Sequence, residues 1–285
     1  MFTDQPVTPT RLETLIDLLR GTRHQFDREK LGAVLQPDEL PGVDPDKNRL
    51  QTTVAVRAAT DLGLVDESGS MLRLTFKGSD SRSTREIVLH ALDARVLAGR
   101  DVEPYFARFY AWLLGLGSAA EVNRSAHDWS VEFETAVFGG RSEKNPFNSA
   151  KYDGLHRWLA YAGLGWYDVK GIFQPNPYER LARRLPAIFG EHRRLSGDEF
   201  MRNMAECCPE LDGGALFVEV LPGWRRDART CTLGLSHALV DLHLDGRIVL
   251  TCTPDSEGWS IAAAEPPSDG KTLLSSRIDF VELAG

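Results

Sequence analysis

One short pattern occurs three times along the chain, and it restricts the possible folds more than any other feature of the sequence. A helical segment ends at a glycine, and a strand, a glycine-containing turn and a second strand follow. The segments AATDLGLVDESGSMLRL and LAYAGLGWYDVKGIFQP share this order and nearly this length. A third version begins with a helix at 236–244 and a strand at 247–252, and it turns at Glu257-Gly258 into 259–261. Such repetition predicts one supersecondary unit used several times.

The first 90 residues add two helices before the first copy of this pattern. Thr10 and Glu13 have the spacing of a capping box, and leucines and isoleucine at 12, 15, 16 and 19 form an apolar stripe. A short second helix follows Asp27, and a third runs from Lys47 to Leu62 into a hairpin that turns at 67–70. Three small helices followed by a hairpin are the order of a winged helix, in which the third helix reads DNA.

The third helix carries the main nucleic-acid prediction. Its inward residues are predicted at four-residue intervals: Leu50, Val54, Ala58 and Leu62. The side chains predicted to contact DNA are Lys47, Asn48, Arg49, Gln51 and Thr52 on this helix, with Arg73 and Lys77 on or beside the wing. Asn, Gln and Arg are base-reading residue types, and Lys47 is placed to meet phosphate. The alternative is a solvated, protein-binding helix, since the acidic residues Asp44 and Asp46 precede it.

The rest of the chain predicts helices joined to further copies of the pattern. Residues 1–80 form the N-terminal winged helix, 81–140 an aromatic helical connector, 141–210 a second winged-helix-like unit with trailing helices, and 211–285 a C-terminal winged-helix-like unit. We therefore expect a mainly α (α+β) fold with short hairpins. No sheet should exceed about four strands, because no segment has the βαβ pattern.

Charge limits the binding surfaces. The chain carries a formal net charge of −8, and residues 231–285 hold 3 basic and 8 acidic side chains. Phosphate is repelled overall, so any DNA contact has to come from local clusters. One such cluster is a helical ridge at Arg180 and Arg184, which are four residues apart. A solvated helix or an acidic-partner surface is the alternative for this ridge.

Localisation follows from what the sequence lacks. It has no apolar run long enough for a membrane span, no basic and apolar leader, and no disulfide or zinc spacing among its 4 cysteines. We expect a reduced, cytoplasmic protein with no membrane partner.

Catalytic and metal motifs are weak. Gly234-Leu-Ser236-His-Ala238 is one residue short of a nucleophile elbow, and Ser236 is a good helix N-cap instead. His237 and Asp241 share a helix face, but His243 points away from it. We therefore predict no catalytic residue, no metal and no cofactor.

Several short runs resemble one protein family. They are Trp158-Leu159-Ala-Tyr-Ala-Gly163-Leu-Gly165, Pro175-Asn-Pro177, Pro209-Glu-Leu-Asp-Gly-Gly214, and Leu235-Ser236-x-Ala238-Leu239-x-x-Leu242 before Gly246-Arg-Ile-x-Leu250. Together they resemble DpdG-type proteins over roughly residues 50–285. These proteins accompany bacterial gene clusters for 7-deazaguanine DNA modification and restriction. The resemblance implies a winged-helix accessory protein, and it supplies no catalytic residues.

Two functional hypotheses remain from the sequence. The first is a non-enzymatic, helix-turn-helix type subunit of a bacterial restriction-modification or antiviral defence system, which binds duplex DNA through residues 47–62. The second is an adaptor that binds other subunits of such a complex without touching DNA. An enzyme is a third and weaker hypothesis, because it requires a reactive Ser236 or a metal.

Overall fold

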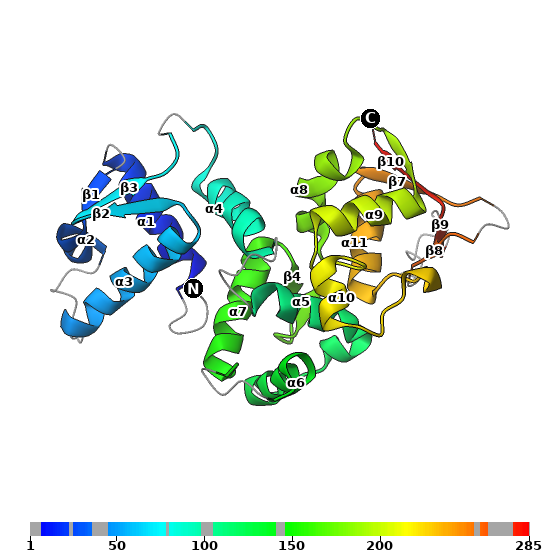
Figure 1. Ribbon diagram of the computed structural model, residues 1–285, viewed down its shortest axis with the longest axis horizontal. Coiled ribbons are helices and arrows are strands. Elements are labelled where there is room, and N and C mark those ends of the chain that lie inside the picture. Colours follow the sequence, from blue (N-terminus) through cyan, green and yellow to red (C-terminus); the bar gives the residue numbers. More distant parts are fainter. Residues whose placement is uncertain are drawn as a thin grey trace. The chain divides into compact units, whose positions relative to one another are not determined.

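The computed structural model is mainly helical, with small antiparallel sheets (Figure 1). It describes residues 7–22, 25–35, 45–77, 80–97, 105–140, 146–253, 257–261 and 276–284, with only the backbone at 45–50 and 121. The chain divides into two compact units: residues 1–104 with 147–158, and residues 105–146 with 159–285. Among the described helices, none is both long and apolar enough to cross a bilayer. The four-segment division expected from the sequence stays a prediction.

The first unit alternates helices with a three-stranded sheet. Its elements are α1 (Pro9–Gly21), β1 (Gln25–Asp27), α2 (Arg28–Leu35), α3 (Pro45–Asp61), β2 (Val65–Ser68), β3 (Met71–Leu74), α4 (Thr84–Leu92), the π-helix η1 (Asp93–Leu97) and the start of α7 (Ser149–Ala162). The predicted stripe of α1 is confirmed, because Leu12, Leu15, Ile16 and Leu19 are all buried. The predicted cap is wrong. Thr8 caps α1 by accepting from Arg11 N, and Pro9 fills the first helical position, where its missing N–H is no loss.

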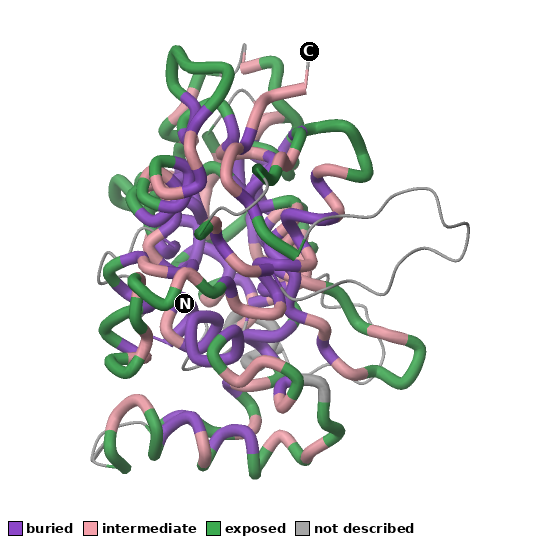
Figure 2. The backbone as a smooth tube through the Cα atoms, turned by 90° about the vertical axis from the view of Figure 1, so that its right-hand side faces the viewer, coloured by how far each residue is buried: buried purple, intermediate pink, exposed green. Residues whose placement is uncertain are grey.

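The sheet of the first unit has the strand order β1-β3-β2. Central strand β3 pairs with β2, placing Leu72 opposite Glu67, and with β1, placing it opposite Phe26. Leu72 is fully buried, whereas residues 66–70 of the hairpin are exposed. Leu72, together with Val65 of β2, thus forms the buried apolar part of the sheet, and the hairpin tip lies in solvent. Figure 2 shows where buried and exposed stretches of the backbone lie.

Helix α3 packs against α1 through a face that matches the predicted one only in part. Its described buried residues are Thr52, Ala55, Val56, Ala58 and Ala59, and Leu62 just past its end is buried as well. Ala58 and Leu62 are thus buried as predicted. Val54, predicted inward, is half-buried, and Leu50 lies outside the described side chains. Residues spaced strictly four apart drift about 40° per step around an α-helix, so they cannot hold one face over three turns. Small residues at 55, 58 and 59 instead allow a close approach of α1.

The second unit consists mainly of helices, and many of the side chains between α5 and α6 are aromatic. Its elements are α5 (Phe106–Gly115), the 3-10 helix η2 (Gly117–Glu121), α6 (Ala126–Phe138), the end of α7, β4 (Gly165–Tyr167), β5 (Phe173–Pro175), α8 (Tyr178–Phe189), β6 (Arg194–Ser196), α9 (Gly197–Cys207), α10 (Ala215–Val220), η3 (Arg226–Ala228), α11 (Leu233–Leu244), β7 (Ile248–Thr251), β8 (Trp259–Ser260), β9 (Arg277–Ile278) and β10 (Phe280–Leu283). Between α5 and α6, Phe109 and Trp112 pack on Phe133 with ring centroids 5.0 and 5.4 Å apart. The predicted aromatic packing of this segment is thus present.

The C-terminal strands pair differently from the prediction. The sequence pattern indicated a hairpin of 247–252 with 259–261. In the structure, β7 pairs with β10 and β8 pairs with β9. The segment between β7 and β10 is an insertion into the hairpin, and a pattern that assumes short turns joins its first strand to the wrong partner.

The repeated pattern is visible in the backbone hydrogen bonds. After α3, α7 and α11 the glycines Gly63, Gly163 and Gly246 have φ of +68°, +72° and +65°. At each junction the next residue donates to the carbonyl five positions back (Leu64 to Ala59, Leu164 to Leu159, Arg247 to Leu242). The same residue accepts from the end of the hairpin (Thr75, Asn176 and Ala284). The left-handed conformation predicted at Gly63 and Gly163 is confirmed, and it ends each helix in the same geometry.

Two of these copies share a longer framework. In the order β6-β10-β7, the C-terminal sheet repeats the order β1-β3-β2. Asp27 pairs with Met71 at the end of β1, and Ser196 pairs with Phe280 at the end of β6. The next residues, Arg28 and Gly197, begin a helix and donate to Ser70 and Asp279. The middle copy differs from both, since β4 and β5 form a two-stranded sheet.

Candidate functional site

The predicted DNA-binding residues at the start of α3 fall where the description is limited to the backbone. Lys47, Asn48 and Arg49 lie within α3, but their side chains are outside the described set. Asp44 lies outside the described residues and Asp46 is described by its backbone alone, so the predicted pairing of Arg49 with either lies outside the described side chains. The structure places these residues on the helix that precedes the β2–β3 hairpin.

Thr52 does not belong to an exposed reading face. It is 7 % exposed and lies on the face of α3 that packs inward. The reason is the rotation described above, which turns Thr52 inward together with Val56. Exposed positions along α3 are instead Thr53, Arg57 and Thr60, at the spacing of one helix face.

Gln51 is brought together with a cation that sequence reasoning missed. Its Oε1 accepts a hydrogen bond from Arg11 on α1. The two residues are 40 positions apart, and no local pattern indicates such a contact. Arg11 therefore adds a guanidinium beside α3, and Gln51 presents its amide group from a fixed position.

The hairpin beside α3 carries both signs of charge. Arg73 and Lys77 are exposed, as a wing contact requires. Asp66 lies directly opposite Arg73 in the strand register, and Glu67 pairs with Arg28. The acidic side chains of β2 thus offset much of the positive charge of β3. The hairpin therefore presents less positive charge than its two basic residues alone would give.

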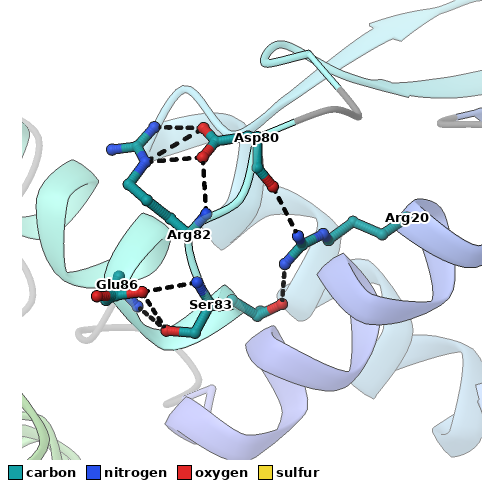
Figure 3. A network of polar contacts seen from close by, with 6 residues as sticks. Arg20, Asp80, Arg82, Ser83 and Glu86 are labelled. Atoms are coloured by element: carbon teal, nitrogen blue, oxygen red, sulfur yellow. Dashed lines mark hydrogen bonds and ion pairs between the residues drawn. The ribbon is translucent and has the colours of Figure 1, made fainter.

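Two further arginines of the first unit have internal roles (Figure 3). Arg20 donates to Thr84 Oγ1 at 3.0 Å and to the Asp80 carbonyl at 3.1 Å. Arg82 binds the Asp80 carboxylate at 2.6 Å, and this contact lowers the pKa of Asp80 to about 2. Ser83 and Glu86 close a capping box at the start of α4. These contacts hold α4 against α1 and occupy both guanidinium groups.

Arg180 is not part of a surface ridge. It is fully buried, and its Nε donates to Glu210 Oε1 at 2.8 Å. Arg184, half-buried one turn later, donates through Nη2 to the Cys207 carbonyl at 3.3 Å. The predicted phosphate-facing ridge is therefore replaced by a contact between α8 and the end of α9. A spacing of four residues places two side chains on one face, but it does not tell whether that face is covered.

The segment Pro209–Gly214 is explained by the same buried region. Glu210 accepts from Arg180, and Asp212 accepts from Thr232 N at 2.6 Å and Thr232 Oγ1 at 2.8 Å. Burial raises the pKa of Asp212 to about 6, although the Thr232 hydrogen bonds act the other way. Burial, with the charges of Glu210 and Asp212, also raises the pKa of Tyr110. The segment links α8 to the N-terminus of α11.

The catalytic and metal candidates also have structural contacts. Ser236 is fully buried and donates to the Thr232 carbonyl at 2.7 Å, and Thr232, not Ser236, caps α11. Asp241 accepts from Asn176 at 2.7 Å, whereas His243 lies 3.3 Å from the Ile248 carbonyl. Within the described residues, no three His, Cys, Asp or Glu side chains gather as a metal would require. Asn176 also anchors the Pro175–Pro177 run, because its Oδ1 accepts from Tyr178 N at 2.9 Å.

The fold and these contacts together define a class of protein. The chain is a mainly helical protein in which one helix–glycine–hairpin framework occurs three times, and its first unit exposes Thr53, Arg57 and Thr60 of α3 next to a hairpin. It belongs to the DpdG-like family, whose model matches residues 2–256. Membership in this family implies a role in a Dpd modification and defence cluster. No curated protein and no solved structure matches the chain.

Proposed function

We propose that this protein is a non-enzymatic subunit of a Dpd-type DNA-modification and defence system, and that it contacts duplex DNA through a winged helix in its first unit. The observation that carries the proposal is the element order α1-β1-α2-α3-β2-β3 with the sheet order β1-β3-β2. In that arrangement α3 is the helix that enters the major groove, and β2–β3 is the wing.

The second unit contains the same helix–glycine–hairpin framework, and a comparison of its helix α11 with α3 favours α3 as the helix that reads DNA. Its counterpart there is α11, in which Leu235, Ala238, Leu239 and Leu242 are fully buried. Helix α11 is packed against α8, α5 and η2. A helix covered on several sides has no free face for a groove. By contrast, α3 exposes Thr53, Arg57 and Thr60.

Local charge supports the contact despite the net charge of −8. Arg57 is exposed on α3, and Arg11 stands beside Gln51. Arg49 precedes Arg57 by eight residues in sequence, so an α-helix places the two positions about 80° apart around its axis. Arg and Gln are side-chain types that form bidentate contacts with guanine and adenine.

Fluorescence anisotropy with labelled duplex DNA at low and high salt tests this function. Arg49→Ala and Arg57→Ala should each weaken binding by about 1–3 kcal/mol, whereas Lys47→Ala should act mainly on the salt slope. The matched control is Arg82→Ala in the same unit, since that guanidinium is held by Asp80. Wild-type protein that does not bind duplex DNA, or that binds it without a salt slope, would contradict the proposal.

An adaptor without direct DNA contact is the second candidate. The exposed apolar hairpin β4–β5 favours it, with Trp166, Tyr167 and Val169 in solvent. The two candidates are separable, because they use different units of the chain. Catalysis is not part of either candidate, and the buried, hydrogen-bonded Ser236 supports that view.

A further inference from the structure

The tip of the β4–β5 hairpin carries an unusual amount of exposed apolar surface. Val169 at the turn is fully exposed, and Trp166 and Tyr167 are 49 % and 44 % exposed. Neighbouring residues of a strand point to opposite faces, so the two aromatic rings flank the ribbon. Tyr167 leans on the buried Phe173, with ring centroids 5.5 Å apart. Clustered exposed aromatic surface of this kind marks interaction sites.

The hairpin is held in one conformation by its own hydrogen bonds. Asp168 Oδ1 accepts from Lys170 N at 2.8 Å and from Ile172 N at 2.9 Å, and the Asp168 carbonyl accepts from Gly171 N at 2.9 Å. Gly171 has a φ of +77°, which the tight turn requires. These contacts fix Val169 at the apex. A preformed tip loses little conformational entropy on binding.

The base of the hairpin is equally fixed. Asn176, directly after β5, donates to the Leu164 carbonyl at 3.0 Å and through Nδ2 to Asp241 on α11 at 2.7 Å. The strands therefore project from a rigid base, and the exposed residues keep their spacing.

Charge at the tip identifies the kind of partner. The N–H groups of Lys170, Gly171 and Ile172 all donate within the hairpin. The Asp168 carboxylate is occupied by two of these donors and by Gln174 Nε2 at 3.4 Å. The hairpin carries two charged groups, and Lys170 is exposed whereas Asp168 is half-buried, so the Lys170 ammonium is the more accessible charge. A phosphate backbone needs more donors than this, whereas a hydrophobic pocket with a carboxylate at its edge matches the tip.

The other well-described hairpin gives a useful contrast. The β2–β3 tip follows the same helix–glycine junction, but its exposed residues 67–70 are Glu-Ser-Gly-Ser. The helix–glycine–hairpin framework therefore does not require an apolar tip, and the apolar residues at 166–172 need another explanation.

Resting on the cluster role put forward under Proposed function, we propose that residues 166–172 of the β4–β5 hairpin insert into an apolar, acid-edged pocket on another protein of the same modification cluster. Trp166, Tyr167 and Val169 fill the pocket, and Lys170 meets the carboxylate at its edge. Tryptophan and tyrosine are the residue types that contribute most at such contacts. The surface differs from the proposed DNA-binding face and belongs to the second unit.

The test measures the affinity of the full chain for each purified protein encoded in the same cluster, by biolayer interferometry. Val169→Asp and Trp166→Ala should each weaken one of these complexes at least tenfold, and Lys170→Glu should weaken it less, with an effect that fades at high salt. Val131→Asp is the control, because Val131 is an exposed valine of the same unit that lies on α6, outside the hairpin. It should change the affinity less than twofold. Circular dichroism should show all four variants folded.

Four results would overturn the proposal. One is the absence of binding to every cluster protein, and a second is binding that Val169→Asp leaves unchanged. A third is a smaller particle for Val169→Asp alone in light scattering, which would make the partner a second copy of this chain. A fourth is a loss of duplex-DNA affinity in Val169→Asp, which would make the hairpin a nucleic-acid contact. Arg57→Ala should retain partner binding, so failure of the DNA proposal is recognised separately.

Discussion

At the scale of single residues, the fully buried ion pair between Arg180 and Glu210 has the largest expected energetic effect. Removing two charges from water is costly, so the pair is stable only while both members are present. Arg180→Met leaves the Glu210 carboxylate buried without its cation. We expect the free energy of unfolding to fall by about 3–5 kcal/mol. Urea unfolding followed by tryptophan fluorescence measures it, since five of the six tryptophans lie in the second unit.

The double variant and a neighbouring arginine provide the controls for this prediction. Arg180→Met with Glu210→Leu should recover most of the lost stability, because no buried charge remains. Arg184→Met should cost far less than Arg180→Met, since Arg184 is half-buried and donates to a carbonyl instead of a carboxylate. Equal losses for the two single variants would show that the ion pair is not the cause.

The same residues show what side-chain patterns predict and what they leave open. The spacing of Arg180 and Arg184 correctly indicates one helix, but it cannot reveal that α9 and the 209–214 segment cover Arg180. The contact of Arg11 with Gln51 is likewise set by how α1 packs on α3. Helix caps are easier to predict from the sequence. The Ser83–Glu86 capping box is present as expected, because it depends on two residues only three positions apart.

At the scale of elements, the three helix–glycine junctions form a natural series. All three glycines are left-handed, and an alanine there costs about 1 kcal/mol for the backbone alone. A Cβ at Gly246 meets nothing within 4 Å. At Gly63 it meets Arg95 Nη2 at 2.6 Å, and at Gly163 it meets Glu179 Cβ at 2.4 Å. An arginine tip moves aside, whereas a Cβ moves only with its helix.

We therefore expect the alanine variants to be destabilised in the order Gly246→Ala, Gly63→Ala, Gly163→Ala, with the first near the backbone cost. Thermal unfolding of the three variants checks the order. Because only steric surroundings differ within the series, equal costs for Gly246→Ala and Gly163→Ala would show that the close contact with α8 relaxes freely.

Elements with short-range signals were the predictable ones. Helix α3, its terminal glycine and the β2–β3 hairpin follow from periodicity and turn residues within about 30 positions. The pairing of β7 with β10 could not be predicted from local sequence, because about 28 residues are inserted between the two strands of this hairpin. The rotation of α3 was missed for a different reason: alanines at 55, 58 and 59 pack closely without a strong apolar signal.

At the scale of the whole molecule, the two units should respond in opposite ways to acid. In the first unit, burial lowers the pKa of His156 to about 3, from an ordinary value of 6.5. The unfolded chain then binds this proton more readily than the folded one. The stability that the neutral imidazole contributes is complete above pH 6.5 and is lost progressively toward pH 3, by up to about 1.4 kcal/mol per pH unit.

In the second unit, Asp212 has the reverse sign. Burial raises its pKa from 3.8 to about 6, so the folded state holds the proton more tightly than the unfolded one. The stability that the protonated Asp212 contributes is complete below pH 3.8 and is lost as the pH rises through 6. Lowering the pH from 7 to 4.5 therefore decreases the stability of the first unit through His156 and increases the stability of the second unit through Asp212. Asp80, with a pKa of about 2, titrates below this window.

Hydrogen exchange resolved by peptide at pH 7 and pH 4.5 measures the opening free energies of the two units separately. We expect the protected amides of α1, α3 and α7 around Trp158 to lose protection at pH 4.5, after correction for the intrinsic exchange rate, while those of α8 and α11 keep theirs. His156→Gln should reduce the acid sensitivity of the first unit and leave the second unchanged. Asp212→Asn should remove the increase in stability that the second unit shows on acidification. If both units lose protection in parallel and His156→Gln has no effect, acid acts through the net charge of the whole chain instead of through these two buried groups.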